Sequence, residues 1–188
     1  MGSSLRLWVG AGCFWKVQAA FEYLHGISRT EVGYLAVPFD GEPIEASDAL
    51  AVPPAWQVEV VELEWDERRL PLRRLMEVFW RIHTPTLVPA DAFSDSSAYR
   101  SLWVCPDPVW RQRFQEEVDR QAQALGAPLQ TRVWGQGHFK PAPPSDQHYY
   151  RAHPQVAYCR SHVIPCLDRL WHLMPDQFDL EVSAHLNE

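Results

Sequence analysis

The sequence predicts an α+β fold, a two-layer α/β plait in which helices pack against one mixed sheet. Strand-like runs of alternating apolar residues and stretches with apolar residues at helical spacing follow one another along the chain. Their order is strand, helix, strand, strand, helix, strand, helix, strand, which is typical of this architecture. A chain of 188 residues, 46% hydrophobic and 22% charged, can fill one core but is short for two. We therefore expect residues 1–188 to form a single domain.

Apolar periodicity places each element, and Gly and Pro mark its ends. Alternation predicts strands, and apolar residues three and four apart predict helices. The expected elements are a strand over 5–9, a helix over 13–24, strands over 28–35 and 56–66, a helix over 72–83, a strand over 98–105, a helix over 108–125 and a strand over 129–134. Irregular loops are expected over 38–54 and 85–97, where Gly, Pro and Ser are frequent.

The last fifty residues show little periodicity. We expect 138–188 to form an irregular tail with one short helix over 146–152. This tail carries Cys159 and Cys166, and the other two cysteines are Cys13 and Cys105. Four cysteines are too few for a disulfide scaffold in a chain of this size, so redox chemistry is favoured over structural disulfides.

Charge and hydropathy argue against several classes of partner. The formal net charge of −7 and the pI near 5.6 leave no basic excess for binding nucleic acid. No apolar run approaches the roughly 18 residues of a membrane span, and the N-terminal residues lack the pattern of a signal peptide. We expect no nucleic-acid partner, no membrane partner and a cytoplasmic location.

Cys13 is the first candidate for chemistry, because it lies where a strand-like run meets a helix. Unpaired N–H groups and the positive end of the helix dipole favour a thiolate at such a position, and the thiolate is the nucleophilic form of cysteine. Phe14 and Trp15 could wall an apolar pocket over the sulfur. The alternative is that Cys13 is a small buried core residue.

Glu59 is the second candidate. Strand alternation places it on the same face as Val61, Leu63 and Trp65. A carboxyl group in apolar surroundings has a raised pKa and can act as a general acid. The alternative is an exposed or salt-bridged glutamate on a strand.

Several segments carry a resemblance to a known family: Gly12-Cys13-Phe14-Trp15, residues 28–34, Glu59 within 58–61, Phe79-Trp80 with His83 and Pro85, Tyr99-Arg100-Ser101 and Tyr158-Cys159. With them the chain resembles the peptide methionine sulfoxide reductase A family over nearly its whole length. The resemblance implies an α/β plait, reduction of the S epimer of methionine sulfoxide, no cofactor, and regeneration by thioredoxin or another dithiol reductant.

The same resemblance implies a role for each matching residue. Cys13 would attack the sulfoxide sulfur and become a sulfenic acid, while Glu59 would protonate the departing oxygen. Tyr99 would help to bind that oxygen. Phe14 and Trp15 would form the wall that contacts the substrate methyl group.

Cys159 and Cys166 match the recycling cysteines that many family members carry in the tail. One would form a disulfide with the oxidised nucleophile, and the other would pass the oxidation to the surface. An alternative for this pair is a zinc site with His162 and His172, although the spacings fit no standard zinc pattern. Cys105 matches no family cysteine and is expected to be a buried thiol.

The chain also departs from the family pattern. Lys16 stands where glycine is frequent, and its cation would lower the pKa of the nucleophile if the side chain points inward. Gln18 replaces a glutamate. Ser94 occupies the position of a family aspartate, with Asp95 beside it, and we assign both, together with Tyr34, to substrate binding.

The leading hypothesis is thiol-dependent reduction of a methyl sulfoxide, either methionine S-sulfoxide, free or in peptides, or a related small sulfoxide. One alternative is a non-catalytic binding module in which Phe14 and Trp15 hold a methylated sulfur ligand. Another is an interaction domain stabilised by zinc in the tail.

Overall fold

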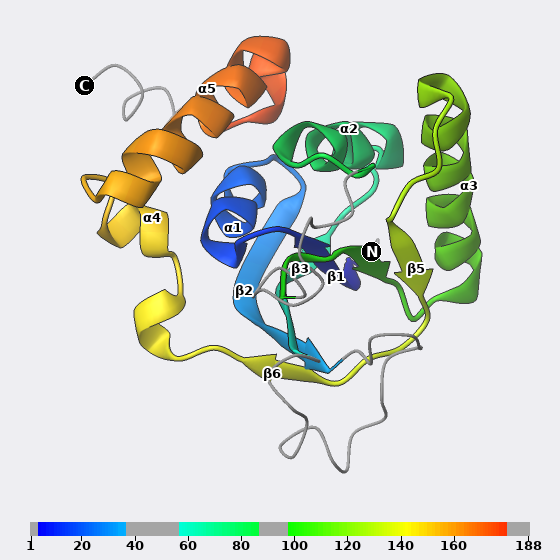
Figure 1. Ribbon diagram of the computed structural model, residues 1–188, viewed down its shortest axis with the longest axis horizontal. Coiled ribbons are helices and arrows are strands. Elements are labelled where there is room, and N and C mark those ends of the chain that lie inside the picture. The colour runs from blue at the N-terminus through cyan, green and yellow to red at the C-terminus, as the bar shows by residue number, and fades with distance from the viewer. Residues whose placement is uncertain (1–3, 37–56, 87–97, 180–188) are drawn as a thin grey trace.

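The structure is a computed structural model that describes residues 4–36, 57–86 and 98–179. Six strands form one sheet in the order β5-β4-β1-β3-β2-β6 (Figure 1). The strands are β1 (Leu5–Ala11), β2 (Ile27–Ala36), β3 (Gln57–Trp65), β4 (Ser101–Val104), β5 (Arg132–Trp134) and β6 (Phe139–Pro141). Strands β4 and β5 pair in parallel, and the other neighbouring pairs are antiparallel. The mixed sheet and the α+β class are therefore confirmed.

Three helices lie where the apolar periodicity places them, namely α1 (Phe14–Glu22), α2 (Leu72–Ile82) and α3 (Pro108–Leu125). Helix α3 has the clearest ends. The Asp107 carboxylate accepts hydrogen bonds from the N–H groups of Val109 (2.9 Å) and Trp110 (3.0 Å), which satisfies two amides at the helix start. Gly126 ends the helix with a φ of 63°, a conformation that glycine adopts at low cost.

The expectation of an irregular tail was wrong. After β6 the chain forms the 3₁₀ turn η4 (Pro144–Asp146), helix α4 (Tyr149–Ala152), the π-helical segment η5 (Cys159–Val163), helix α5 (Ile164–Leu173) and the 3₁₀ turn η6 (Pro175–Gln177). The short helix expected over 146–152 corresponds to α4. Helix α5 buries Leu167 and Leu170 against the core, and η5 buries Val163. Pro165 lies in the first turn of α5, a position that proline favours, but the helical residues of η5 come directly before it, so the sequence shows no separate start of the helix.

Apolar residues are buried on both faces of the sheet. The larger cluster lies between the sheet and the helices and includes Trp65, Trp103 and Phe114. A smaller cluster contains Leu35, Val58, Val60, Leu102 and Val104. Because β3 and β4 contribute to both clusters, these strands are mostly apolar rather than strictly alternating.

Strand β6 returns the tail to the edge of the sheet, next to β2 (Figure 1). The pairing needs glycine at position 33, because a Cβ atom there would lie 2.3 Å from the carbonyl oxygen of Lys140 and 2.5 Å from the Phe139 ring. The Gln147 side chain then holds the chain to the same edge: its amide donates to the Val32 carbonyl and its oxygen accepts from the Val32 N–H, both at 2.9 Å. This edge fixes where α4 and η5 lie beside α1.

Within the ranges described, no helix has the length and apolar character that crossing a membrane requires.

Candidate active site

Cys13 occupies the turn between β1 and α1. The preceding residue, Gly12, has a φ of 101°, which favours glycine. Cys13 is the N-cap residue of α1, and its carbonyl accepts hydrogen bonds from the N–H groups of Lys16 (3.1 Å) and Val17 (3.2 Å). Its side chain makes no capping hydrogen bond, so the half-buried sulfur is left for other contacts.

The pKa of Cys13 is raised, mainly because burial disfavours the thiolate. The Glu59 carboxylate raises it further, whereas the Tyr158 hydroxyl and the N–H groups of Trp15 and Lys16 lower it. The N–H groups at the helix start favour the thiolate, as expected, but burial outweighs them and the pKa is raised overall. We expected the ammonium group of Lys16 to lower the pKa of Cys13. Instead, its charge lowers the pKa values of His83 and Cys166.

Glu59 lies on β3 and faces the start of α1. Its Oε2 accepts a 2.9 Å hydrogen bond from the backbone N–H of Phe14, the residue after Cys13. Burial raises the pKa of Glu59, the nearby Asp146 carboxylate also raises it, and the Phe14 N–H opposes the shift. A carboxyl with a raised pKa can keep a proton beside the thiol, which is the property a general acid needs.

Phe14 and Tyr34 form one wall of this region. Phe14 is buried, and its ring centroid lies 5.5 Å from that of Tyr34. Tyr34 is also the cross-strand partner of Glu59, and burial followed by the charges of Glu59, Asp146 and Cys13 raises its pKa. The structure therefore brings Tyr34, a predicted substrate-binding residue, next to both the thiol and the acid.

Trp15 links the start of α1 to the tail. Its ring stacks on Tyr149 with centroids 3.8 Å apart and an interplanar angle of 8°, and it contacts Tyr158 edge-on at 5.8 Å. Its indole N–H donates to Asp146 Oδ1 at 3.1 Å. These contacts hold the Trp15 ring from three sides, all of them supplied by the tail.

Sequence reasoning missed Tyr158 and Asp146 as site residues. The Tyr158 hydroxyl donates a hydrogen bond to the Cys13 sulfur, and the pKa of Tyr158 is strongly raised, first by burial and then by Cys13. Its position directly before Cys159 in a segment that resembles the family was a usable signal. Asp146 had no comparable signal, because only the return of the tail along β2 brings it to Trp15.

Tyr99, the predicted oxygen-binding residue, lies at the edge of the site. It is 43% exposed, and it contributes to the raised pKa of Tyr158. The other two predicted substrate-binding residues, Ser94 and Asp95, lie outside the described residues, as does the expected loop over 38–54.

The tail brings two buried, free thiols toward Cys13. Burial raises the pKa of Cys159, and the charge of Cys13 raises it further. Burial also raises the pKa of Cys166, whereas the cations of Lys16 and Arg169 lower it. Cys159 thus interacts electrostatically with the nucleophile, and Cys166 interacts with a basic region beside it.

Cys105 is buried, as expected, at the end of β4, where its S–H lies 3.6 Å from the Asp107 carbonyl and burial raises its pKa to about 11. The imidazoles proposed for a zinc site have other contacts. His162 lies 2.7 Å from the Ser161 hydroxyl, and His172 lies 2.8 Å from the Asp168 carbonyl. In the described part of the chain, no three His, Cys, Asp or Glu side chains are grouped so that they could hold a metal ion.

Two curated proteins are similar to this chain over most of its length. Peptide methionine sulfoxide reductase MsrA of Campylobacter jejuni is 27% identical over 162 residues, covering 86% of this chain and 95% of that protein. The MsrA of Halobacterium salinarum is 30% identical over 165 residues, covering 86% of this chain and 91% of that protein.

Solved structures share the fold. Mxr1 from Saccharomyces cerevisiae in reduced form has a TM-score of 0.66 at 21% identity, covering 85% of this chain and 91% of its own. Mxr1 in complex with Trx2 has a TM-score of 0.50 at 18% identity, covering 78% and 85%. The family model described as peptide methionine sulfoxide reductase matches residues 6–175. The chain therefore belongs to the peptide methionine sulfoxide reductase family.

Proposed function

We propose that the protein reduces a methyl sulfoxide at Cys13, the substrate being methionine S-sulfoxide, free or in peptides, or a related small sulfoxide. The observation that carries this proposal is the contact between Glu59 and the residue after Cys13. A carboxyl with a raised pKa lies beside a half-buried thiol, and the Tyr158 hydroxyl donates to the sulfur. Such a site holds a nucleophile and a proton source together.

The chemical step transfers the oxygen atom from substrate sulfur to Cys13. The Cys13 thiolate attacks the sulfoxide sulfur and forms an S–S bond while Glu59 protonates the oxygen, because an unprotonated oxygen is a poor leaving group. The hydroxyl then moves from the substrate sulfur to the Cys13 sulfur as the S–S bond breaks, which releases the thioether. The sulfoxide is reduced by two electrons to a thioether, and Cys13 is oxidised by two electrons to a sulfenic acid. The thiol proton and the transferred oxygen end as the sulfenic hydroxyl, so no external oxidant or cofactor is needed.

We propose that Cys159 resolves the sulfenic acid. Its thiol attacks the Cys13 sulfur, water leaves, and a Cys13–Cys159 disulfide remains. Exchange with Cys166 would move the disulfide away from Cys13. Thioredoxin or another dithiol reductant then restores the thiols, and the fold shared with a protein solved in complex with Trx2 supports that partner. This cycle suits a reducing compartment, and we propose the cytoplasm.

The aromatic wall supports a preference for a methyl group on sulfur. Phe14 is buried and packs against Tyr34, and the Trp15 ring is held by Tyr149 and by Asp146. Rings held in this way present a preformed apolar surface that can bind a methyl group and exclude water from the reacting sulfur. A pure binding module would use the same wall, so turnover at Cys13 separates the two functions.

A single-turnover assay tests the proposal. Wild-type protein and the Cys13→Ser and Cys105→Ser variants are each mixed with one equivalent of an S-epimer methyl sulfoxide without any reductant. We expect wild type and Cys105→Ser to yield one equivalent of thioether and to lose two hydrogens by mass spectrometry, as a disulfide forms. Cys13→Ser should yield none. Undiminished reduction by Cys13→Ser would overturn the proposal, and binding without turnover by wild type would establish the binding module instead.

A further inference from the structure

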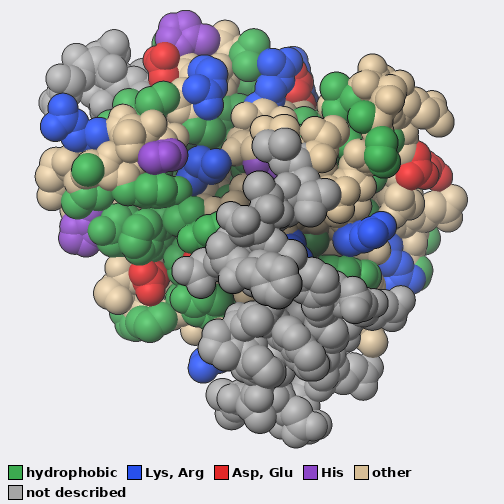
Figure 2. Space-filling model, viewed as in Figure 1, with side chains coloured by type: hydrophobic (Ala, Val, Ile, Leu, Met, Phe, Trp, Pro, Cys, Tyr) green, Lys and Arg blue, Asp and Glu red, His purple; other side chains and the backbone are tan. Residues whose placement is uncertain are grey.

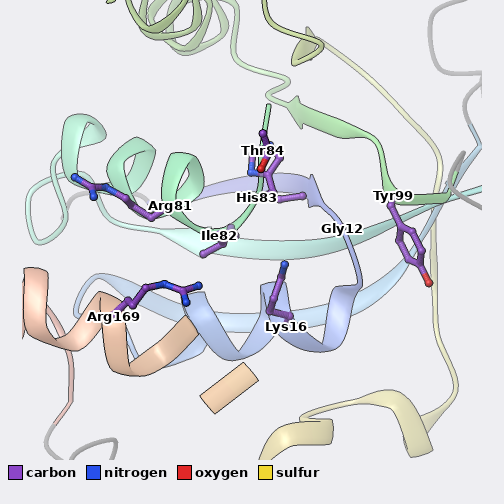
Figure 3. Close-up of a pocket in the computed structure, with 9 residues that line it drawn as sticks. Gly12, Lys16, Arg81, Ile82, His83, Thr84, Tyr99 and Arg169 are labelled. Atoms are coloured by element: carbon purple, nitrogen blue, oxygen red, sulfur yellow. The ribbon is translucent and has the colours of Figure 1, made fainter. Parts of the chain in front are cut away.

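A cavity of about 460 Å³ lies directly beside the turn that carries Cys13 (Figure 3). Its lining comes from the β1–α1 turn, the end of α2, α5 and the residues just before β4. Gly12 and Lys16 line it from the nucleophile side, and Tyr99 lies across from them. The mechanism proposed above uses none of these lining residues.

The cavity is basic. Lys16 from α1, Arg81 from α2 and Arg169 from α5 all line it, and none of the described lining residues is acidic. Within the described ranges, the ion pairs of arginine side chains involve other arginines. None of these ion pairs includes Lys16, Arg81 or Arg169. In the space-filling view, several basic side chains lie on the part of the surface where α1, α2 and α5 are found, with acidic side chains beside some of them (Figure 2).

Two of the cations are directed at the same space. Figure 3 shows the Lys16 side chain rising from α1 toward Ile82 and His83, and the Arg169 side chain reaching from α5 toward Lys16. Both charges act on the Cys166 thiol, so both lie within electrostatic range of one atom. The two cations repel each other, and an anion bound between them would be attracted by both.

The neutral polar side chains of the lining include His83 and Thr84. His83 lies between the Phe79 carbonyl (2.9 Å) and the Ser101 hydroxyl (2.7 Å), and burial lowers its pKa to about 4, so it is uncharged near neutral pH. Thr84 is exposed beside it and carries a hydroxyl that can donate to an anion. The positive charge of the cavity therefore comes from the lysine and the two arginines.

The cavity is close enough to Cys13 to hold another part of the same substrate. Lys16 follows Cys13 by three residues, one helical turn, and its Nζ is 3.9 Å from the position that a Cβ atom on Gly12 would occupy. On the other side, Tyr99 acts electrostatically on Tyr158, whose hydroxyl donates to the Cys13 sulfur. A small molecule with its sulfur at Cys13 can thus place an anionic group among the cations.

We propose that this cavity binds a carboxylate of the sulfoxide substrate, with Lys16 and Arg169 as the main partners and Arg81 at the rim. The inference rests on the function proposed above and names its substrate class, a methyl sulfoxide that carries a carboxylate a few bonds from sulfur. The carboxylate of a free amino acid, the C-terminus of a peptide and a carboxylated small sulfoxide share this chemistry.

Matched substrates that differ only in charge test the inference. The S epimers of N-acetylmethionine sulfoxide and of its carboxamide are compared in single turnovers without reductant, so that recycling cannot contribute. We expect half-saturation of the carboxylate at about 10-fold lower concentration than the carboxamide, the scale of one or two charge-assisted hydrogen bonds. Sulfate should compete with the carboxylate and leave the carboxamide unaffected.

Substitution of the lining cations shows which residues cause the preference for the carboxylate. Lys16→Met and Arg169→Met should each remove most of the preference for the carboxylate while leaving carboxamide turnover unchanged. Arg73→Met is the matched control, because Arg73 is an exposed arginine of α2 outside this cavity. Arg169 is also exposed, so its replacement disturbs no core packing and remains informative if Lys16→Met folds poorly. Comparing peptides with methionine sulfoxide at the C-terminus and in the middle, and 3-(methylsulfinyl)propanoate, separates the sources of the carboxylate.

The outcomes separate this inference from the proposed function. Equal half-saturation by both substrates in wild type would overturn the carboxylate site and leave sulfoxide reduction standing. If neither substrate is reduced, the proposed function fails, and calorimetric binding of the two compounds to the Cys13→Ser variant decides the inference by itself. Tighter binding of the carboxylate, abolished by Arg169→Met, would support the site, and equal binding would refute it.

Discussion

The backbone N–H of Phe14 donates a 2.9 Å hydrogen bond to Oε2 of Glu59, which joins the first helical residue after the nucleophile to the central strand β3. This bond fixes the position of one carboxyl oxygen of Glu59. It also lowers the pKa of Glu59, but burial, the larger effect, raises it. The contact therefore positions the acid without removing its ability to hold a proton.

Replacing the acid should slow the chemical step. Glu59→Gln keeps the size of the side chain and an oxygen for the Phe14 N–H, but it cannot donate a carboxyl proton. We expect the single-turnover rate to fall about 100-fold or more, the usual scale for a lost general acid. Rapid-quench measurement of thioether formation gives the rate. Glu64→Gln, at a more exposed position of β3, is the control, and an unchanged rate in Glu59→Gln would show that another group protonates the oxygen.

Tyr158→Phe should change the pH dependence of the reaction. The hydroxyl donates to the Cys13 sulfur and lowers the pKa of the thiol, so its loss should raise that pKa. The attacking form is the thiolate, so at a fixed pH below the pKa of the thiol the variant should react more slowly than wild type. Tyr23→Phe, a buried tyrosine elsewhere in the core, should leave the profile in place.

Thiol alkylation with iodoacetamide against pH gives the pKa of Cys13 without substrate. If Tyr158→Phe and wild type titrate together, the hydrogen bond to sulfur has no energetic weight.

The two tail cysteines should differ after one turnover. The charge of Cys13 acts on Cys159, whereas Cys166 interacts with Lys16 and Arg169. We expect Cys166→Ser to accumulate a Cys13–Cys159 disulfide and Cys159→Ser to accumulate the sulfenic acid on Cys13, trapped with dimedone. Peptide mapping identifies both species. A Cys13–Cys166 disulfide formed at full speed in Cys159→Ser would reverse the proposed order.

Gly33→Ala should detach the tail from the sheet edge. The added Cβ would meet the Lys140 carbonyl oxygen at 2.3 Å, and a backbone atom cannot move aside as a flexible side chain can. We expect a loss of about 1 to 3 kcal/mol of unfolding free energy in urea titrations, the usual range for an overpacked site. Disulfide formation with Cys159 should slow as well, because β6 and the tail behind it are displaced.

Gly126→Ala separates stability from positioning in that experiment. Gly126 has a φ of 63°, but a Cβ there would meet nothing within 4 Å, so the variant strains the end of α3 without moving the tail. It should lower the free energy of unfolding while leaving the rate of disulfide formation unchanged. Equal slowing in both variants would indicate a general loss of stability.

The sequence predicted those helices and strands whose ends are marked by nearby residues. Helix α3 is an example, because Asp107, Pro108 and Gly126 mark its ends in the sequence and the structure places them there. The tail lacked such marks. Helix α5 is stabilised by burying Leu167 and Leu170 against the core, a contact between distant parts of the chain that no local window contains.

The sequence by itself determined the α+β order of elements, the placement of Cys13 at the start of a helix and the apolar face on which Glu59 lies. Only the tertiary structure decided that the pKa of Cys13 is raised, because that pKa depends on burial and on Tyr158, a residue 145 positions away in a segment expected to be irregular. The basic cavity is likewise tertiary, since Lys16, Arg81 and Arg169 come from three helices. The secondary structure depends on residues that are close in the sequence, whereas the pKa values and the charge of the cavity depend on residues that are close in space.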